Sequence, residues 1–193
     1  NPLAAIRLQA QILRRQESEG KLTPAMAASG AEKIDTIAGR INKIIVGLLS
    51  LSRNAESDPL ERTSTKKLVD DTLEFCAGNL MAKEIRVIRS VVEEEFFIDC
   101  RPIQISQVLL NLINNARDAV CKLDERWIRV DVKSIFGKVQ ISISDSGTSL
   151  LPKVRARMME PFFTTKKDGN GTGLGLSISR KILENHRGEL LLA

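Results

Sequence analysis

The chain has 193 residues, which allows one large domain or two small ones. Hydrophobic residues make up 42% and charged residues 27%, as in an ordinary globular protein. The net charge of +5 is spread along the sequence and aromatic residues reach only 4%, so no nucleic-acid partner is expected.

The first predicted element is a helix that ends near a turn at residues 17–21. Its apolar residues recur every three or four positions, which is the spacing of one helical face: Leu3, Ile6, Ala10 and Leu13. Thr23 followed by Pro24 predicts the start of a second helix, because a hydroxyl can cap the first turn and proline fits its first position.

The second helix carries a narrow apolar seam. Its members hold a/d heptad positions: Ile34, Ile37, Ile41, Ile44, Leu48, Leu51 and Ala55. Two helices cannot enclose such a seam, so we expect a homodimer in which two hairpins form a four-helix bundle. The open alternative is that the hairpin packs on the rest of the chain as an ordinary core.

Composition and punctuation suggest three segments. We assign residues 1–55 to the helical hairpin, 56–62 with Pro59 to a linker, and 63–193 to an α/β domain. The longest apolar run, 44–51, is too short to span a bilayer, so no membrane segment is expected here. Three cysteines without metal-binding spacing fit a reducing, cytoplasmic location. The sequence does not begin with Met, and we expect it to be part of a longer protein that could be membrane-anchored.

The α/β domain should open with two helices and two short strands. Ser64 is a predicted cap for a helix over 66–83, and strands are expected over 86–92 and 95–99. The candidates for burial in the first helix are Leu68, Val69, Leu73, Phe75 and Leu80. A second helix over 102–123 has an apolar face made of Ile105, Val108, Leu109, Leu112, Ile113, Ala116 and Val120.

This second helix also has a polar face. Its members stack on one side: Gln104, Gln107, Asn111, Asn115 and Asp118. Asparagine is a poor residue inside a helix, because its amide competes for backbone hydrogen bonds. Asn111 and Asn115, one turn apart, could present two oxygens to Mg²⁺, whose other ligands would be waters and phosphate oxygens. A solvated helix face is the alternative.

A β-hairpin is predicted next. Apolar and polar residues alternate over 128–133 and again over 139–145, so Asp145 falls on the apolar side at the end of its strand. A carboxylate there needs hydrogen-bond donors, which a ligand amino group, a helix N-terminus or backbone amides could supply.

The segment after Asp145 has no clear periodicity until Gly171, which is typical of a functional lid or of disorder. Within it, Phe162 and Phe163 could anchor the lid and Lys166 could reach a phosphate, although either phenylalanine could simply pack in the core. Four glycines then alternate with other residues over 169–175 and lead into a helix. Such a stretch favours phosphate binding, because backbone amides and the helix dipole attract anions. We expect 169–173 to be the mobile hinge of the lid and 173–176 its fixed end.

These motifs together resemble a sensor histidine kinase core, with a dimerisation and phosphoacceptor hairpin followed by an ATPase domain of the Bergerat type. Residues 111–116 resemble the N box, 145–147 the first glycine box, 160–166 the F box and 171–176 the second glycine box. The order and spacing of all four carry the resemblance, which spans nearly the whole chain. It implies an α+β fold: a helical hairpin, then an α/β sandwich with a mixed sheet and helices on one face.

The resemblance also implies a function, ATP-dependent phosphorylation of a histidine and transfer of the phosphoryl group to an aspartate of a response-regulator receiver domain. Asn111 and Asn115 would hold Mg²⁺ on the nucleotide, Asp145 would accept the adenine amine, and Gly147 would let the backbone pass the base. The implied nucleotide-binding residues are Asn111, Asn115, Asp118, Asp145, Gly147, Phe162, Phe163, Thr165, Lys166, Gly171, Thr172, Gly173, Leu174, Gly175 and Leu176.

Some positions depart from the family pattern. Ser149 and Arg187 stand where glycine is usual. Residues 1–6 resemble the tail of the H box, which places the phosphoacceptor histidine four residues before Asn1, outside this sequence. Asn1 is then a candidate for orienting the water that dephosphorylates the regulator. His186, the one histidine present, is expected to be a surface residue at a helix C-terminus, where the dipole favours it.

Two other functions stay open. A degenerate kinase could act as a nucleotide-binding scaffold, which Ser149 and the missing histidine would permit. A gyrase-type or chaperone-type ATPase resembles the chain in its nucleotide boxes, but such proteins typically carry a glutamate general base where Asn111 stands and lack a heptad hairpin.

Overall fold

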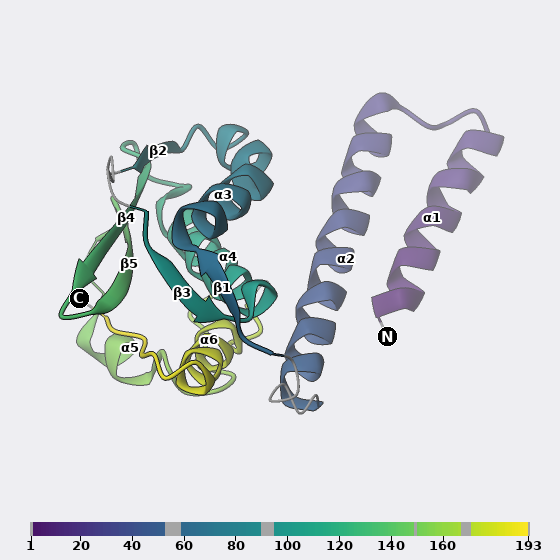
Figure 1. Cartoon of the computed structure of the whole chain (residues 1–193). Coiled ribbons are helices and arrows are strands. Elements are labelled where there is room, and N and C mark those ends of the chain that lie inside the picture. Colours follow the sequence, from purple (N-terminus) through teal and green to yellow (C-terminus); the bar gives the residue numbers. More distant parts are fainter. Residues whose placement is uncertain (1, 53–58, 90–94, 149, 167–170, 193) are drawn as a thin grey trace. The chain divides into compact units, whose positions relative to one another are not determined.

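A computed structural model describes residues 2–52, 59–89, 95–148, 150–166 and 171–192, apart from the side chains of 2, 40 and 42–52. It divides into two compact units, one built on a helical hairpin and one on mixed α/β structure (Figure 1). Among the described residues, no helix combines the length and apolar character needed to cross a membrane.

The hairpin consists of helix α1 (Pro2–Ser18) and helix α2 (Pro24–Ser52). The chain turns through Gly20, whose φ of 65° is the left-handed conformation that glycine adopts without strain. Thr23 Oγ1 accepts a hydrogen bond from the Met26 N–H at 3.2 Å, and Pro24 is the first helical residue. The predicted start of this helix is therefore confirmed.

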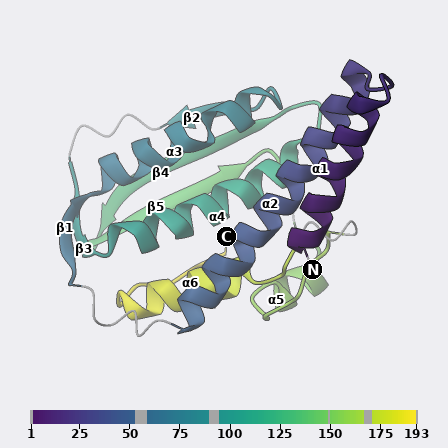
Figure 2. The same ribbon diagram turned by 90° about the vertical axis from the view of Figure 1, so that its right-hand side faces the viewer.

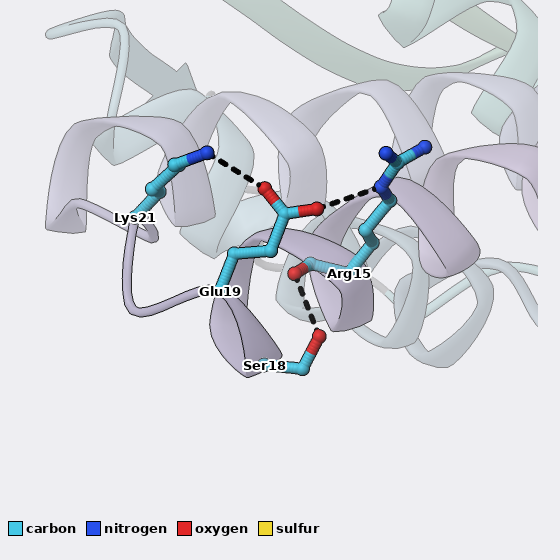
Figure 3. Close-up of polar contacts among 4 residues, drawn as sticks. All are labelled: Arg15, Ser18, Glu19 and Lys21. Atoms are coloured by element: carbon cyan, nitrogen blue, oxygen red, sulfur yellow. Dashed lines mark hydrogen bonds and ion pairs between the residues drawn. The ribbon is translucent and has the colours of Figure 1, made fainter.

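Polar side chains close the turn between the two helices (Figure 3). Arg15 Nε and Lys21 Nζ lie 2.8 Å and 2.9 Å from the two carboxylate oxygens of Glu19, and Ser18 Oγ donates to the Arg15 carbonyl. Hydrogen bonds from Arg15 first and Lys21 second lower the pKa of Glu19. The three side chains are exposed, so salt screens the interaction and its contribution to stability is small.

The two helices approach closely where Leu13 packs on Gly30, since a Cβ added at Gly30 would lie 2.7 Å from Leu13 Cδ1. Of the predicted α1 face, Ile6, Ala10 and Leu13 are half-buried, whereas Leu3 is 61% exposed. Three of the heptad positions in α2, namely Ile34, Ile37 and Ile41, are half-buried. The remaining seam residues, Ile44, Leu48, Leu51 and Ala55, lie outside the described side chains.

The α/β unit contains two sheets and four helices among its described residues. The elements are β1 (Glu61–Ser64), α3 (Thr65–Met81), β2 (Arg86–Arg89), β3 (Phe97–Cys100), α4 (Pro102–Val120), β4 (Trp127–Ile135), β5 (Lys138–Asp145), α5 (Pro152–Arg157) and α6 (Gly175–Asn185). Strand β4 pairs in parallel with β2 and antiparallel with β5, which makes the expected mixed sheet. Helices α3 and α4 lie on one face of this sheet (Figure 2).

One hydrophobic core joins α3, α4, α6 and the sheet. Residues at helical spacing on α4 are nearly inaccessible, and Val120 and Ile128 have no exposed surface. The predicted apolar face of α4 is thereby confirmed. Phe75 is a wrong prediction: it is 76% exposed, because it follows the buried Leu73 by two residues and so points to the other side of α3.

Burial also decides the chemistry of two cysteines. It raises the pKa of the Cys76 and Cys100 thiols, which stay protonated and unreactive at neutral pH.

Several local predictions need correction. Glu61 and Arg62, assigned to the linker, belong to β1, which pairs antiparallel with β3. Helix α5 lies within the segment for which the sequence predicts no regular element. Its six residues are too few to show a helical pattern. The sequence predicts the turn of the β-hairpin at Gly137 and Lys138, whereas the two turn residues between β4 and β5 are Phe136 and Gly137, both with positive φ.

The end of α6 shows why glycine is usual at position 187, where this sequence has arginine. The Gly188 N–H donates to the Leu183 carbonyl and the Arg187 N–H to the Glu184 carbonyl, which is a Schellman arrangement. Arg187 has a φ of 56° there. Glycine takes this conformation without strain, which gives a physical reason for its usual presence at this position.

Candidate nucleotide-binding site

The polar face of α4 is only partly exposed to solvent. Asn111, Asn115 and Asp118 are all half-buried, and polar atoms of Gln104 and Gln107 are inaccessible to solvent. Asn111 Nδ2 donates to the Gly175 carbonyl at 3.4 Å and to Ser179 Oγ at 3.3 Å. The N-box helix is thus in direct contact with the helix that the glycine-rich stretch begins.

Asp145 lies on the core side of the sheet, as its alternation predicts. It pairs in register with Ile128, which has no exposed surface, and directly opposed residues of an antiparallel pair face the same side. Asp145 Oδ1 accepts a hydrogen bond from the Gly147 N–H at 2.8 Å. A backbone amide therefore meets at least one oxygen of this carboxylate.

A side chain at position 147 would displace the Asp145 carboxylate. A Cβ added there would lie 2.6 Å from Asp145 Oδ1 and 3.5 Å from the Cβ of Ala119. The loop after β5 therefore rests on α4, eight residues along the helix from Asn111. Eight residues of α-helix span about 12 Å. The two glycine boxes meet the same helix at points separated by that length, which suits an elongated ligand.

The F box and the second glycine box are joined through their backbones. The Phe162 N–H donates to the Gly173 carbonyl at 2.9 Å, and the two residues have φ angles of 67° and 65°. A Cβ added at Gly173 would lie 2.3 Å from the Phe162 carbonyl carbon, so only glycine fits. We call this pair the backbone clasp.

The two phenylalanines of the F box differ in environment. The Phe162 side chain is 74% exposed, whereas Phe163 is half-buried with the Arg157 guanidinium 4.6 Å from its ring centre. Packing of both rings in the core is therefore excluded. Of the two, Phe163 can anchor the segment, through the contact of its ring with the Arg157 guanidinium.

The remaining predicted residues fall into four groups. Asp118 Oδ1 lies 2.6 Å from Nη2 of its neighbour Arg117, which takes up part of its accepting capacity. Leu174, Gly175 and Leu176 are half-buried at the start of α6. Thr165 is exposed, and Lys166, Gly171 and Thr172 are half-buried. Asn1, Ser149, Gly169 and Asn170 lie outside the described residues.

His186 has a different role from the predicted one. It is half-buried, its Nε2 accepts the Arg101 N–H at 3.0 Å, and its Nδ1 lies 2.7 Å from the Ile182 carbonyl. Arg101 immediately precedes α4, so this ring links the beginning of α4 to the end of α6. The partners are 85 positions apart, so no local pattern could indicate the contact.

Ser179 is the buried polar residue that sequence reasoning missed. It has no exposed surface and accepts from Asn111. Its position four residues after Gly175, on the same side of a helix, is the one signal that could have identified it.

The side chains on the polar face of α4 could bind a divalent cation that takes only a few of its ligands from the protein. No group of three or more His, Cys, Asp or Glu side chains suited to a metal occurs in the part of the chain that the structure describes. The neutral amide oxygens of Asn111 and Asn115 on α4 are the candidate protein ligands. This agrees with Mg²⁺, which usually binds through one or two side chains together with phosphates and waters.

Helices cover one face of a mixed sheet, and one of them, α4, contacts both glycine boxes. This combination defines a class of ATP-binding domain. Residues 100–192 match the family described as histidine kinase-, DNA gyrase B- and HSP90-like ATPase. The chain belongs to the histidine kinases within this class. The catalytic domain of histidine kinase ThkA is 30% identical and matches with a TM-score of 0.57 over 66% of this chain and 82% of that chain.

Other relatives extend the match to the hairpin. The signal transduction histidine-protein kinase AtoS of Escherichia coli (strain K12) is 33% identical over 100% of this chain, which spans 30% of the length of AtoS. The crystal structure of ThkA in complex with response regulator protein TrrA shares the fold, with a TM-score of 0.63 at 22% identity, over 97% of this chain and 52% of that one. A gyrase-type or chaperone-type assignment is thereby set aside.

Proposed function

We propose that this chain is the core of an ATP-dependent protein-histidine kinase of a two-component system. One observation carries the proposal: α4 contacts the second glycine box at Asn111 and the first glycine box near Ala119. A nucleotide lying along this helix would have its base near Asp145 and its phosphates near Gly175. Residues in the range 111–176 would then position the nucleotide for phosphoryl transfer.

Each end of the site has a proposed role. Asp145 accepts the adenine amine, and the absence of a side chain at Gly147 leaves room for the base. Asn111 and Asn115 hold Mg²⁺, and the segment 171–176 surrounds the phosphates. The cation neutralises phosphate charge, which is most of what catalysis requires in this type of reaction.

The metal role is tested by measuring ATP affinity with Mg²⁺ and with EDTA. We expect the protein to bind ATP more tightly with Mg²⁺. Asn115→Ala should lower the affinity about three- to tenfold in Mg²⁺, because it removes one interaction about as strong as a hydrogen bond. It should leave the affinity in EDTA unchanged. Isothermal titration calorimetry gives both values.

Asn185→Ala is the matched control, because Asn185 is an exposed asparagine at the end of α6. It should change neither value. Equal ATP affinity of the parent protein with and without Mg²⁺ would refute the metal role.

The phosphoryl group is proposed to pass to a histidine four residues before Asn1 and then to a receiver domain. The complex of ThkA with TrrA supports a response regulator as the kind of partner. A scaffold without kinase activity is the second candidate, favoured by Ser149 in place of glycine. A histidine at that upstream position, read from the longer sequence, separates kinase from scaffold.

The hairpin is proposed to form the homodimer. Apolar side chains on its outer surface support this, since Leu8 is 58% exposed and Ile12 40% exposed, one turn apart on α1. Sedimentation equilibrium at micromolar concentration should give twice the chain mass of 21.4 kDa. Leu8→Glu should shift the mass toward the monomer, whereas Gln11→Glu on the neighbouring exposed position should not. A monomeric parent protein would contradict the four-helix bundle.

A further inference from the structure

Ser179 is a buried hydroxyl-bearing residue beside the proposed metal ligand Asn111. It lies in α6, where the neighbouring residues Ile178 and Ile182 belong to the hydrophobic core. Its side chain is fully inaccessible, and its Oγ is 3.3 Å from Asn111 Nδ2. A buried polar residue in such surroundings has to make hydrogen bonds, and Asn111 supplies one of them.

The contacts of Asn111 determine which way its amide faces. The Gly175 carbonyl can only accept a hydrogen bond, so the amide nitrogen must face α6 and the amide oxygen cannot. At 3.4 Å this hydrogen bond is long and weak by itself. Ser179 Oγ accepts from the same amide nitrogen, so the Gly175 carbonyl selects the orientation and the Ser179 hydrogen bond adds to its stability.

Gly175 lies beside the Asn111 amide. The three nearest atoms to a Cβ added at Gly175 would all belong to that amide, with Cγ at 3.7 Å, Oδ1 at 3.8 Å and Nδ2 at 4.0 Å. Because Nδ2 is the atom that α6 holds, Oδ1 is the amide atom that remains available to a ligand.

We propose that Ser179 is a positioning residue, which holds the Asn111 amide with its oxygen turned toward the metal of the bound nucleotide. The inference rests on the proposed function, in which Asn111 helps to bind Mg²⁺. A rotated amide would present an NH₂ group to the cation, and correcting it on binding would cost affinity. If a neighbouring hydrogen bond already holds the Asn111 amide in the binding orientation, that cost is avoided.

The test compares ATP affinity in Mg²⁺ and in EDTA for the 193-residue chain, Ser179→Ala, Asn111→Ala and the double variant. Ser179→Ala should weaken binding roughly three- to tenfold in Mg²⁺ and less than about twofold in EDTA, as expected for loss of one orienting hydrogen bond. In the Asn111→Ala background, Ser179→Ala should have no further effect, because it acts through Asn111.

Two further variants keep the test decisive. Thr72→Val removes a buried hydroxyl from α3, where Thr72 Oγ1 donates to the Leu68 carbonyl, and should not change either affinity. Ser179→Cys nearly conserves volume and serves if alanine proves destabilising. It should show a smaller loss in Mg²⁺, since sulfur is a weaker acceptor.

The outcomes separate the inference from the proposed function. A parent protein without Mg²⁺-dependent ATP binding overturns both. A parent with Mg²⁺-dependent binding that Ser179→Ala does not alter overturns the inference alone. Equal losses in Mg²⁺ and EDTA, additive effects with Asn111→Ala, or failure of both Ser179 variants to fold would assign Ser179 to the fold and also overturn it.

Discussion

Asp145→Asn should weaken ATP binding about 10- to 100-fold without loss of the fold. This range is expected when a hydrogen bond to a charged acceptor is replaced by two donors facing each other. The carboxylate has two accepting oxygens, and Oδ1 already accepts from the Gly147 N–H. An asparagine can keep that hydrogen bond through its single oxygen. Its other atom then becomes an NH₂ donor, which would face the donating amine of adenine.

The measurement is calorimetric ATP titration, together with thermal unfolding to verify that the fold is retained. Asp99→Asn is the control, since Asp99 is an exposed aspartate on β3 and its replacement removes the same charge. Its ATP affinity should stay within about twofold of the parent protein, the effect of a distant exposed charge in salt. An Asp145→Asn protein with unaltered affinity would exclude the adenine contact.

The second large effect is expected at the backbone clasp. Gly173→Ala places a Cβ where the Phe162 carbonyl carbon would be 2.3 Å away, so one of the two backbone segments must move. Both segments belong to proposed ATP-binding boxes, and Gly173 is two residues from the contact of Gly175 with Asn111. We expect a loss of about 3 kcal/mol or more in unfolding free energy, from backbone strain and steric overlap together, and at least about tenfold weaker ATP binding.

Gly137→Ala separates the clash from the cost of the dihedral angle. Gly137 has a φ of 76° in the β4–β5 turn, and a Cβ added there meets nothing within 4 Å. Its replacement should cost about 1 kcal/mol, the penalty of a left-handed alanine, and leave ATP binding intact. Urea unfolding measures both variants. Equal destabilisation by the two substitutions would show that the clasp can relax and has no special role.

The sequence alone predicted the elements whose burial follows a regular period. The apolar positions of α4 recur at helical spacing and are buried as expected, and Ser64 and Thr23 cap the helices they were predicted to cap. Alternation along β5 placed Asp145 on the core side correctly. These predictions succeeded because helix and strand geometry fix which side chains share a face, whatever lies opposite.

Short or irregular elements were less visible. Strand β1 has four residues and a half-exposed pattern, so its pairing with β3 left no mark in the local sequence. Phe75 was assigned to the core on hydrophobicity, although its place on the helix turns it outward.

The tertiary structure decided how the motifs contact one another. The partners of Asn111, His186 and Phe162 come from other elements, and Asn111 and Ser179 are separated by 68 positions. The contacts of Asn111 and His186 depend on the packing of α6 against α4, and the contact of Phe162 depends on the approach of two segments outside the helices. No periodicity encodes any of them. The sequence therefore predicted candidate groups for an ATP-binding site, while the orientation of the Asn111 amide and the clasp at Gly173 followed only from the packed structure.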